Sequence, residues 1–358
     1  MSRFFSEKYK NLVPYTPGEQ PKDTQYIKLN TNESPFPPSE RAMICALEES
    51  RNLQLYPDPE CRALTEKTAE LCGVSYNEVL MTNGSDEILN FAFMAFCDEN
   101  HPAAFPDISY GFYKVFAELN NVPYTEIPLK DDFSIDLNDY KNINKTIFIA
   151  NPNAPTGITL SLEQIEEILK SNPNNVVVID EAYVDFGAES CLPLIKKYDN
   201  LLVCQTFSKS RSMAGARLGF GVGNKNLIAD LNTVKYSTNP YNINRMTMAA
   251  GLGVLSDELY TKTNCEIIAE NRENTSKKLK EMGFTLTDSK SNFIFAKHPK
   301  INGEYIYQKL KQKGILVRHF SKDRINEYVR ITVGTKEQMT ALIFALNKIL
   351  EEQNDQSC

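Results

Sequence analysis

Three polar residues with chemically useful side chains follow three apolar runs at a constant spacing. Asn151, Asp180 and Lys209 are each 29 residues apart, about the length of one strand–helix unit. A lysine at the end of a buried strand is costly, because an unpaired ammonium group is expensive to desolvate. A desolvated lysine amine is more easily neutral, and a neutral amine is the nucleophile that forms a Schiff base. Lys209 is therefore a candidate nucleophile.

Residues that bind phosphate surround this lysine. Ser208 precedes it and Arg217 follows eight residues later, and both side-chain types hydrogen-bond phosphate oxygens well. An earlier signal is the Asn-Gly-Ser turn at 83–85, which joins an apolar run to a helical pattern beginning at Asp86. Free backbone N–H groups at such a helix N-terminus bind anions. A Schiff-base lysine among phosphate-binding groups predicts an aldehyde-bearing, phosphorylated cofactor.

The remaining polar residues at the strand ends fit an aromatic, nitrogen-containing ring. A buried Asp180 needs a cationic partner, and a protonated pyridine nitrogen is one that makes the ring an electron sink. A helix N-cap or a structural ion pair is the alternative for this carboxylate. Tyr183 and Asn153 are placed to donate to a ring-bound phenolate oxygen. Tyr110 is placed to stack on a flat ring, or to serve as a packing residue.

The elements that must position these residues alternate between strands and helices. Apolar runs at 146–150, 176–179 and 201–204 read as strands, and Ser161 begins a helix through a capping box with Gln164. This alternation, with nearly continuous apolar strands, predicts an α/β fold with a mainly parallel sheet covered by helices on both faces. Ligands collect at the carboxyl ends of the strands in such sheets, where the polar residues lie.

The chain divides into three predicted parts. Residues 1–40 form a proline-rich N-terminal arm that closes over the site and associates with the small domain. Residues 41–260 form the large domain with the cofactor site. A long helix at 259–282 leads into a small α+β C-terminal domain, residues 261–358, in which short alternating strands lie between helices.

The composition excludes several classes of protein. The 358 residues are 42% hydrophobic and 24% charged, which excludes disordered and collagen-like chains. The formal charge of −7 argues against a nucleic-acid binder, although local arginines can still hold a small anionic substrate. Three histidines and eight cysteines without a C-x-x-C pair predict no metal site. The chain shows no signal peptide and no membrane-length apolar run, so we expect a cytoplasmic protein.

Six motifs, in this order and spacing, carry a family resemblance: NGSDE, DISY, NPNAPTG, VVVIDEAY, TFSKSRSMAGARLGFG and YVRITVG. Together they resemble the class I/II aminotransferases, which are fold-type I pyridoxal-phosphate enzymes with the fold of aspartate aminotransferase. Within that family the chain is most similar to the histidinol-phosphate aminotransferases. The matches span nearly the whole sequence, from LNTNESP to ITVG.

The resemblance implies a role for each matching residue around pyridoxal 5′-phosphate. Lys209 would form the internal aldimine with the cofactor and then shuttle the proton. Asp180 would pair with the pyridine nitrogen, Tyr183 with the 3′-oxygen, and Tyr110 would stack on the ring. The phosphate would be bound by Gly84, Ser85, Asp86, Ser208 and Arg217.

Further matches imply how the substrate is bound. Arg330 would take the substrate phosphate, with Arg318 and Tyr15 assisting, and would bind the glutamate carboxylate in the other half-reaction. Asn32 lies in the segment that closes over the substrate. Tyr56 would reach the phosphate of the neighbouring subunit, which implies a homodimer with shared active sites.

One position departs from the family pattern. The family often has Asn immediately before Pro-Thr-Gly, and here Ala154 stands there. Either Asn153 fills the 3′-oxygen role through a shifted loop, or Tyr183 fills it alone.

The implied reaction is ping-pong transamination of histidinol phosphate and 2-oxoglutarate to imidazole-acetol phosphate and glutamate, a step of histidine biosynthesis. Aromatic amino acids, or decarboxylation of threonine phosphate, are alternatives on the same fold. The paired Arg318 and Arg330 favour a phosphorylated substrate but do not separate the two phosphorylated ones. A non-catalytic cofactor-binding regulator would need a DNA-binding module, for which the N-terminal arm is too short.

Overall fold

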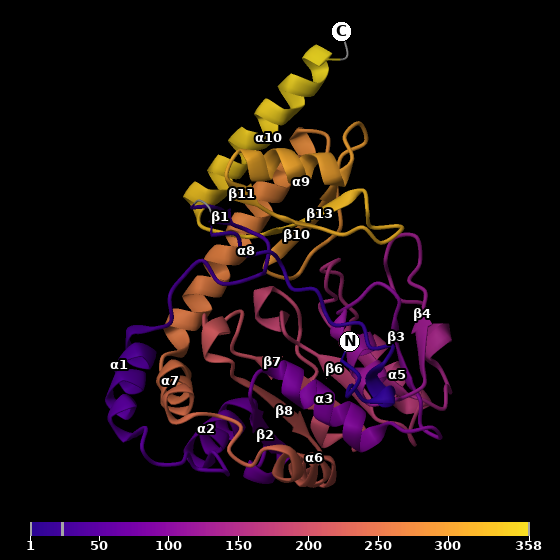
Figure 1. Cartoon of the computed structure of the whole chain (residues 1–358), viewed down its shortest axis with the longest axis vertical. Coiled ribbons are helices and arrows are strands. Elements are labelled where there is room, and N and C mark those ends of the chain that lie inside the picture. Colours follow the sequence, from indigo (N-terminus) through magenta and orange to yellow (C-terminus); the bar gives the residue numbers. More distant parts are fainter. Residues whose placement is uncertain (1, 23–24, 357–358) are drawn as a thin grey trace.

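The computed structural model describes residues 2–22 and 25–356. Positions 1 and 23–24 of the predicted arm, and 357–358 of the predicted small domain, lie outside this part. Figure 1 shows a larger body around one sheet and a smaller body beyond it, with helix α8 (Glu258–Glu281) running from one to the other. In the described part, no helix is both long and apolar enough to cross a membrane.

The larger body is built on a seven-stranded sheet with the order β2-β8-β7-β6-β5-β3-β4. The pairs among β7, β6, β5, β3 and β4 are parallel, whereas β8 runs antiparallel to both of its neighbours. The mainly parallel sheet is therefore confirmed. The strands are β2 (Val79–Thr82), β3 (Ala103–Pro106), β4 (Tyr124–Ile127), β5 (Thr146–Ala150), β6 (Val177–Asp180), β7 (Leu201–Thr206) and β8 (Gly219–Gly223).

Helices cover both faces of this sheet, as the apolar strands predict. Along β5, Ile147 and Ile149 pack into one hydrophobic core, while Phe148 and Ala150 pack into the other, because successive side chains point to opposite faces. The first face is covered by α2 (Arg62–Cys72), α5 (Leu162–Ser171) and α7 (Arg245–Leu255), with α1 (Glu40–Glu49) on α7. The second is covered by α3 (Ser85–Phe96), α4 (Phe112–Leu119) and α6 (Lys225–Thr238).

The local signals for the helix starts are confirmed, and one strand is longer than predicted. The Ser39 hydroxyl accepts a hydrogen bond from the Ala42 amide at the start of α1, and Ser161 and Gln164 form a capping box at α5. Strand β7 extends to Thr206, because Thr206 pairs with Gly219 on β8. The apolar pattern does not reveal that pairing.

The smaller body contains a four-stranded antiparallel sheet with the order β12-β13-β10-β9. Its elements are β9 (Thr285–Leu286), β10 (Phe293–Lys297), α9 (Gly303–Gln312), β11 (Ile315–Leu316), β12 (Arg318–His319), β13 (Tyr328–Thr332) and α10 (Lys336–Gln356). Strand β1 (Ile27–Lys28), from the N-terminal segment, pairs in parallel with β11. The adjacent Leu29 is buried in the core of this body. The division at residues 40 and 260 remains our prediction.

Candidate active site

Two cavities with shared walls lie at the carboxyl edge of the seven-stranded sheet, the smaller at the ends of β5, β6 and β7 and the larger beside the end of β3. The smaller, about 380 Å³, is bounded by the last residues of these strands, Ala150, Asp180 and Thr206. It also brings together most of the predicted cofactor residues: Ser85, Asp86, Tyr110, Tyr183, Ser208, Lys209 and Arg217. The larger, about 840 Å³, shares Tyr110, Tyr183 and Lys209 and adds Tyr15, Asn32, Arg318 and Arg330.

An anion cradle forms where β2 turns into α3. Gly84 precedes the helix with a φ of 77°, and a Cβ there would lie 2.7 Å from Nη2 of Arg217. A Cβ on Gly219 would lie 2.5 Å from the backbone nitrogen of Ser85. The absence of side chains at these two glycines therefore lets the guanidinium group and strand β8 lie close to the helix N-terminus. A free helix N-terminus facing an arginine is suited to a phosphate.

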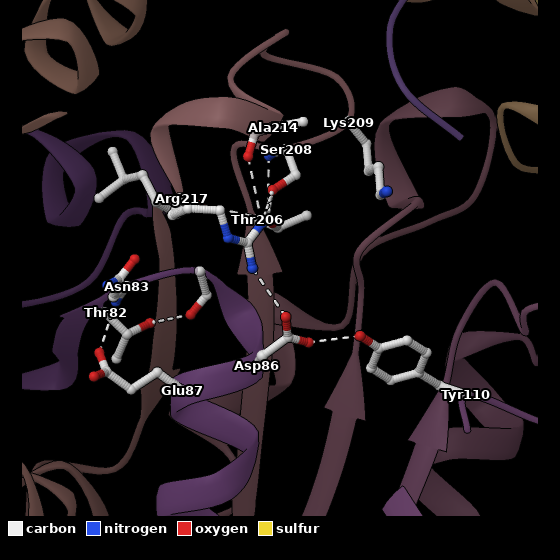
Figure 2. Close-up of polar contacts among 12 residues, drawn as sticks. Thr82, Asn83, Asp86, Glu87, Tyr110, Thr206, Ser208, Lys209, Ala214 and Arg217 are labelled. Atoms are coloured by element: carbon white, nitrogen blue, oxygen red, sulfur yellow. Dashed lines mark hydrogen bonds and ion pairs between the residues drawn. The ribbon is translucent and has the colours of Figure 1, made fainter. Parts of the chain in front are cut away.

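Arg217 is held at this cradle by neighbouring side chains, as Figure 2 shows. Its guanidinium donates to Oδ2 of Asp86 at 2.9 Å and to Oγ of Ser208 at 3.3 Å. The other Asp86 oxygen accepts from the Tyr110 hydroxyl at 2.6 Å. Burial raises the pKa of Tyr110 well above its usual value, so this phenol remains a donor. Asp86 thus links the cradle to Tyr110.

Asp180 is a buried carboxylate with polar but neutral partners. It accepts from the Tyr113 hydroxyl at 3.1 Å and from the Ala182 amide at 3.2 Å. Within the described residues, no lysine, arginine or histidine forms an ion pair with it. Burial raises the pKa of Asp180 to about 7. A cationic ring nitrogen in the cavity would supply the missing partner and keep this carboxylate ionised.

This raised pKa predicts that the stability of the protein without cofactor depends on pH. Between the usual pKa of 3.8 and the folded value of about 7, the folded chain binds a proton at Asp180 that the unfolded chain has lost. Stability from this group therefore falls as pH rises through that window. Asn does not titrate, so Asp180→Asn should gain about 2 to 4 kcal/mol relative to wild type between about pH 4.5 and about pH 7.5. Urea unfolding of wild type and Asp180→Asn at both pH values measures the difference in their free energies of unfolding. If that difference is the same at both pH values, the prediction is contradicted.

Lys209 lies between the sheet and the N-terminal segment. Its Nζ donates to the Thr31 carbonyl oxygen at 3.3 Å and lies 5.8 Å from the centroid of the Tyr183 ring. The Tyr183 hydroxyl in turn accepts from Nδ2 of Asn32 at 2.9 Å. The sequence reasoning missed Thr31, because its contact uses a backbone oxygen that carries no side-chain signal.

The larger cavity contains two arginines available to an anion. Arg330 is partly buried; its Nη2 donates to the Asn30 carbonyl at 3.3 Å, and its buried Nε has no hydrogen-bond partner among the described residues. Burial lowers the pKa of Arg330, which reflects the cost of leaving this cation without a counter-ion. Arg318 donates only weakly, at 3.4 Å, to the carbonyls of Thr16 and Pro17. Tyr15 stacks on Phe112 with ring centroids 4.3 Å apart.

Two predicted site residues are not brought to these cavities within one chain. The Nδ2 group of Asn153 donates to Thr156 Oγ1 in its own loop and to Ile108 O in the loop after β3, both at 3.0 Å, so both amide hydrogens are already used. Ala154, not Asn153, lines both cavities. Tyr56 is 78% exposed and stacks on Tyr241, outside the residues that line either cavity.

Tyr113 is a site residue that sequence reasoning missed. It lies on α4, three residues after Tyr110, and is fully buried with its hydroxyl on Asp180. Tyr110 lies before Gly111, the N-cap of α4, so the two tyrosines are not a helical pair and their spacing gave no periodic signal.

The fold and this site define a class of enzyme, and the family comparison agrees. The family model described as aminotransferase class I and II matches residues 24–346. The chain therefore belongs to the class I and II aminotransferase family.

Two curated relatives point to a particular member of this family. The histidinol-phosphate aminotransferase of Brachyspira hyodysenteriae is 53% identical over 353 residues, covering 98% of this chain and 100% of that protein. The enzyme of the same name from Clostridium beijerinckii is 47% identical and 98% of each chain is covered.

Solved structures share the fold. Histidinol-phosphate aminotransferase from Sinorhizobium meliloti, in complex with pyridoxal-5′-phosphate, has a TM-score of 0.89 at 22% identity and covers 99% of both chains. The enzyme from Clostridium acetobutylicum has a TM-score of 0.84 at 24% identity, with 91% of this chain and 99% of the other covered. The fold-type I architecture predicted from the motifs is confirmed.

Proposed function

We propose that this chain transfers the amino group of histidinol phosphate to 2-oxoglutarate, with pyridoxal 5′-phosphate as cofactor. The observation that carries the substrate assignment is the pair Arg318 and Arg330, which line the same cavity as Lys209. The buried Nε of Arg330, which has no hydrogen-bond partner among the described residues, favours an anionic substrate group over an apolar side chain. The full-length similarity to histidinol-phosphate aminotransferases supports the same substrate.

The described residues fit this cofactor in three respects. The cradle of Gly84, Arg217 and Ser208 fits its phosphate, buried Asp180 fits its ring nitrogen, and Lys209 fits its aldehyde. When bound, the cofactor supplies an electron sink for the negative charge that develops at the substrate Cα.

The chain supplies proton transfer and anion binding. The Nζ amine of Lys209 takes the proton from the substrate Cα and delivers a proton to complete the transfer, acting as general base and acid. Lys209 lines the wall shared by both cavities, which supports a position between cofactor and substrate. Arg330 binds the substrate phosphate in one half-reaction and a carboxylate of 2-oxoglutarate in the other, so the two substrates use the site in turn.

If the substrate is phosphorylated, threonine phosphate is the alternative to histidinol phosphate. L-threonine-O-3-phosphate decarboxylase from Porphyromonas gingivalis shares the fold with a TM-score of 0.78 at 22% identity. That likeness concerns the fold alone, and the two arginines suit either phosphate. Measured activity must therefore decide between histidinol phosphate and threonine phosphate as the substrate.

A panel of amino donors with 2-oxoglutarate tests the assignment. We expect kcat/KM for histidinol phosphate to exceed that for histidinol, which lacks only the phosphate, and that for phenylalanine by about 10²-fold. In Arg330→Gln the preference for histidinol phosphate over histidinol should shrink, because the phosphate loses its buried partner. Release of carbon dioxide from threonine phosphate at a higher rate than any transamination would contradict the assignment.

We further propose a homodimer in which Tyr56 contributes to the partner's site. The support is a cluster of exposed apolar side chains on α1 and the residues after it: Met43, Ile44, Leu47, Leu53, Leu55 and Tyr56. Such a patch is typical of a protein–protein interface. Sedimentation should give twice the 40.6 kDa mass of the chain. A cytoplasmic location is part of the proposal and rests on the sequence argument alone.

A further inference from the structure

The hydroxyl group of Tyr183 receives a hydrogen bond from a residue 151 positions earlier in the chain. Nδ2 of Asn32 donates to the Tyr183 oxygen at 2.9 Å. A phenol has one hydrogen to donate, and here its oxygen already accepts from an amide. The hydroxyl hydrogen of Tyr183 is therefore left for an acceptor elsewhere. Tyr183 lines both cavities beside Lys209, so that acceptor can lie in the cofactor site.

The orientation of the Asn32 amide follows from its other contacts. The Thr332 hydroxyl accepts from the backbone N–H of Asn32 at 2.9 Å and donates its own hydrogen to Asn32 Oδ1 at 3.1 Å. The opposite end of the amide must then be the nitrogen, which faces Tyr183. In this arrangement the Thr332 hydroxyl, at the end of β13, donates to one end of the amide and Tyr183 accepts from the other, so Asn32 is the donor to Tyr183.

The backbone of Asn32 is held by the small domain as well. Its carbonyl oxygen accepts from Nδ2 of Asn292 at 2.9 Å, and the residue is 1% exposed with a φ of 56°. This left-handed conformation is uncommon outside glycine, although asparagine tolerates it better than most residues. Asn32 is thus fixed to the small domain through Thr332 and Asn292, while its side chain contacts Tyr183 in the large domain.

At Asn153 and Ala154, the loop between β5 and α5 offers no alternative donor to the cofactor site. Ala154 lines both cavities with a methyl group, and the amide hydrogens of Asn153 are bound to Ile108 and Thr156. The side-chain hydroxyl of Tyr183 is left to interact with a ring oxygen of the cofactor.

We infer that Asn32 is a positioning residue: it directs the hydroxyl hydrogen of Tyr183 into the cofactor cavity and couples the small domain to the cofactor. It then acts through Tyr183, in addition to lying in the segment that the family resemblance places over the substrate. The inference rests on the proposed cofactor site.

Charged groups around Tyr183 stay the same when Asn32 is replaced by a neutral residue. They come from several elements and comprise Lys209 after β7, Arg330 on β13, Asp180 at the end of β6, Asp86 and Arg217 at the cradle, and Glu33; the titratable but neutral Tyr15 and Tyr110 also line these cavities. A change in proton affinity in Asn32→Ala therefore reports the lost hydrogen bond and not a lost charge.

The test is a pH titration of the visible absorption band of the protein loaded with pyridoxal phosphate. A hydrogen bond to the cofactor's ring oxygen stabilises the form that has lost its proton, because that form carries more negative charge on the oxygen. Asn32→Ala should raise the midpoint by about 0.5 to 1 pH unit. Asn32→Asp should raise it further, because its carboxylate accepts the Tyr183 hydrogen and adds a negative charge. Thr332→Val, which leaves Asn32 in place but frees its amide to flip, should give a smaller rise.

A double-mutant cycle separates this role from general loosening of the structure. In the Tyr183→Phe background, Asn32→Ala should shift the midpoint no further, because the group through which it acts is gone. An unchanged midpoint in Asn32→Ala, or an equal shift in both backgrounds, would overturn the inference while leaving the proposed function intact. A wild-type protein with no visible band would overturn the proposed function and this inference with it.

Discussion

We expect Lys209→Ala to lower turnover by about 10⁴-fold or more, because it removes both the nucleophile for the cofactor and the base for the substrate proton. Lys209 lines both cavities, and its amine donates a hydrogen bond to the Thr31 carbonyl. Steady-state formation of glutamate from histidinol phosphate and 2-oxoglutarate measures the loss.

The matched control is Lys196→Ala. Lys196 is an exposed lysine at the end of a short 3₁₀ helix and lines neither cavity. We expect it to keep wild-type activity, so that loss in Lys209→Ala cannot be assigned to net charge. A fully active Lys209→Ala protein would contradict the proposed mechanism.

We expect Asp180→Asn to lower kcat/KM by about 10²- to 10³-fold, because a neutral amide cannot hold the cofactor ring in its protonated form. The substitution keeps the size of the side chain and can still accept from Tyr113 or Ala182, which donate to Asp180 in the structure. The same variant should be the more stable one without cofactor at neutral pH, so activity and stability move in opposite directions.

Glu181→Gln controls for loss of a buried carboxylate. Glu181 is as buried as its neighbour, but its oxygens accept from Ser190, Cys191 and Gln205 and it lines neither cavity. We expect it to lose stability while the folded fraction keeps its activity. If Glu181→Gln slows the reaction as much as Asp180→Asn, the special role of Asp180 is wrong.

The sequence predicted the sheet and the residues at its carboxyl edge, because both depend on local pattern. Apolar runs define buried strands, and the polar residue that ends each run must lie at one edge when the strands are parallel. Asp180 and Lys209 were found this way, and the structure places both on the smaller cavity.

Contacts between distant segments could not be predicted from the pattern. The bond from Asn32 to Tyr183 depends on the pairing of β1 with β11, which brings the N-terminal segment onto the small domain. The loop that binds the amide of Asn153 internally depends on the packing of residues 108 and 156 around it. Neither the Asn32–Tyr183 bond nor the packing around Asn153 leaves a periodic signal in the sequence. Only the three-dimensional structure therefore shows that Ala154, and not Asn153, lines the cavity.

The central claim is that Lys209 carries the cofactor. Borohydride reduction of the protein loaded with pyridoxal phosphate, followed by proteolysis and mass spectrometry, locates the lysine that becomes permanently linked to it. We predict that the linked peptide contains Lys209 and that prior incubation with glutamate reduces the yield. A link at another lysine, or no link at all, would contradict the account.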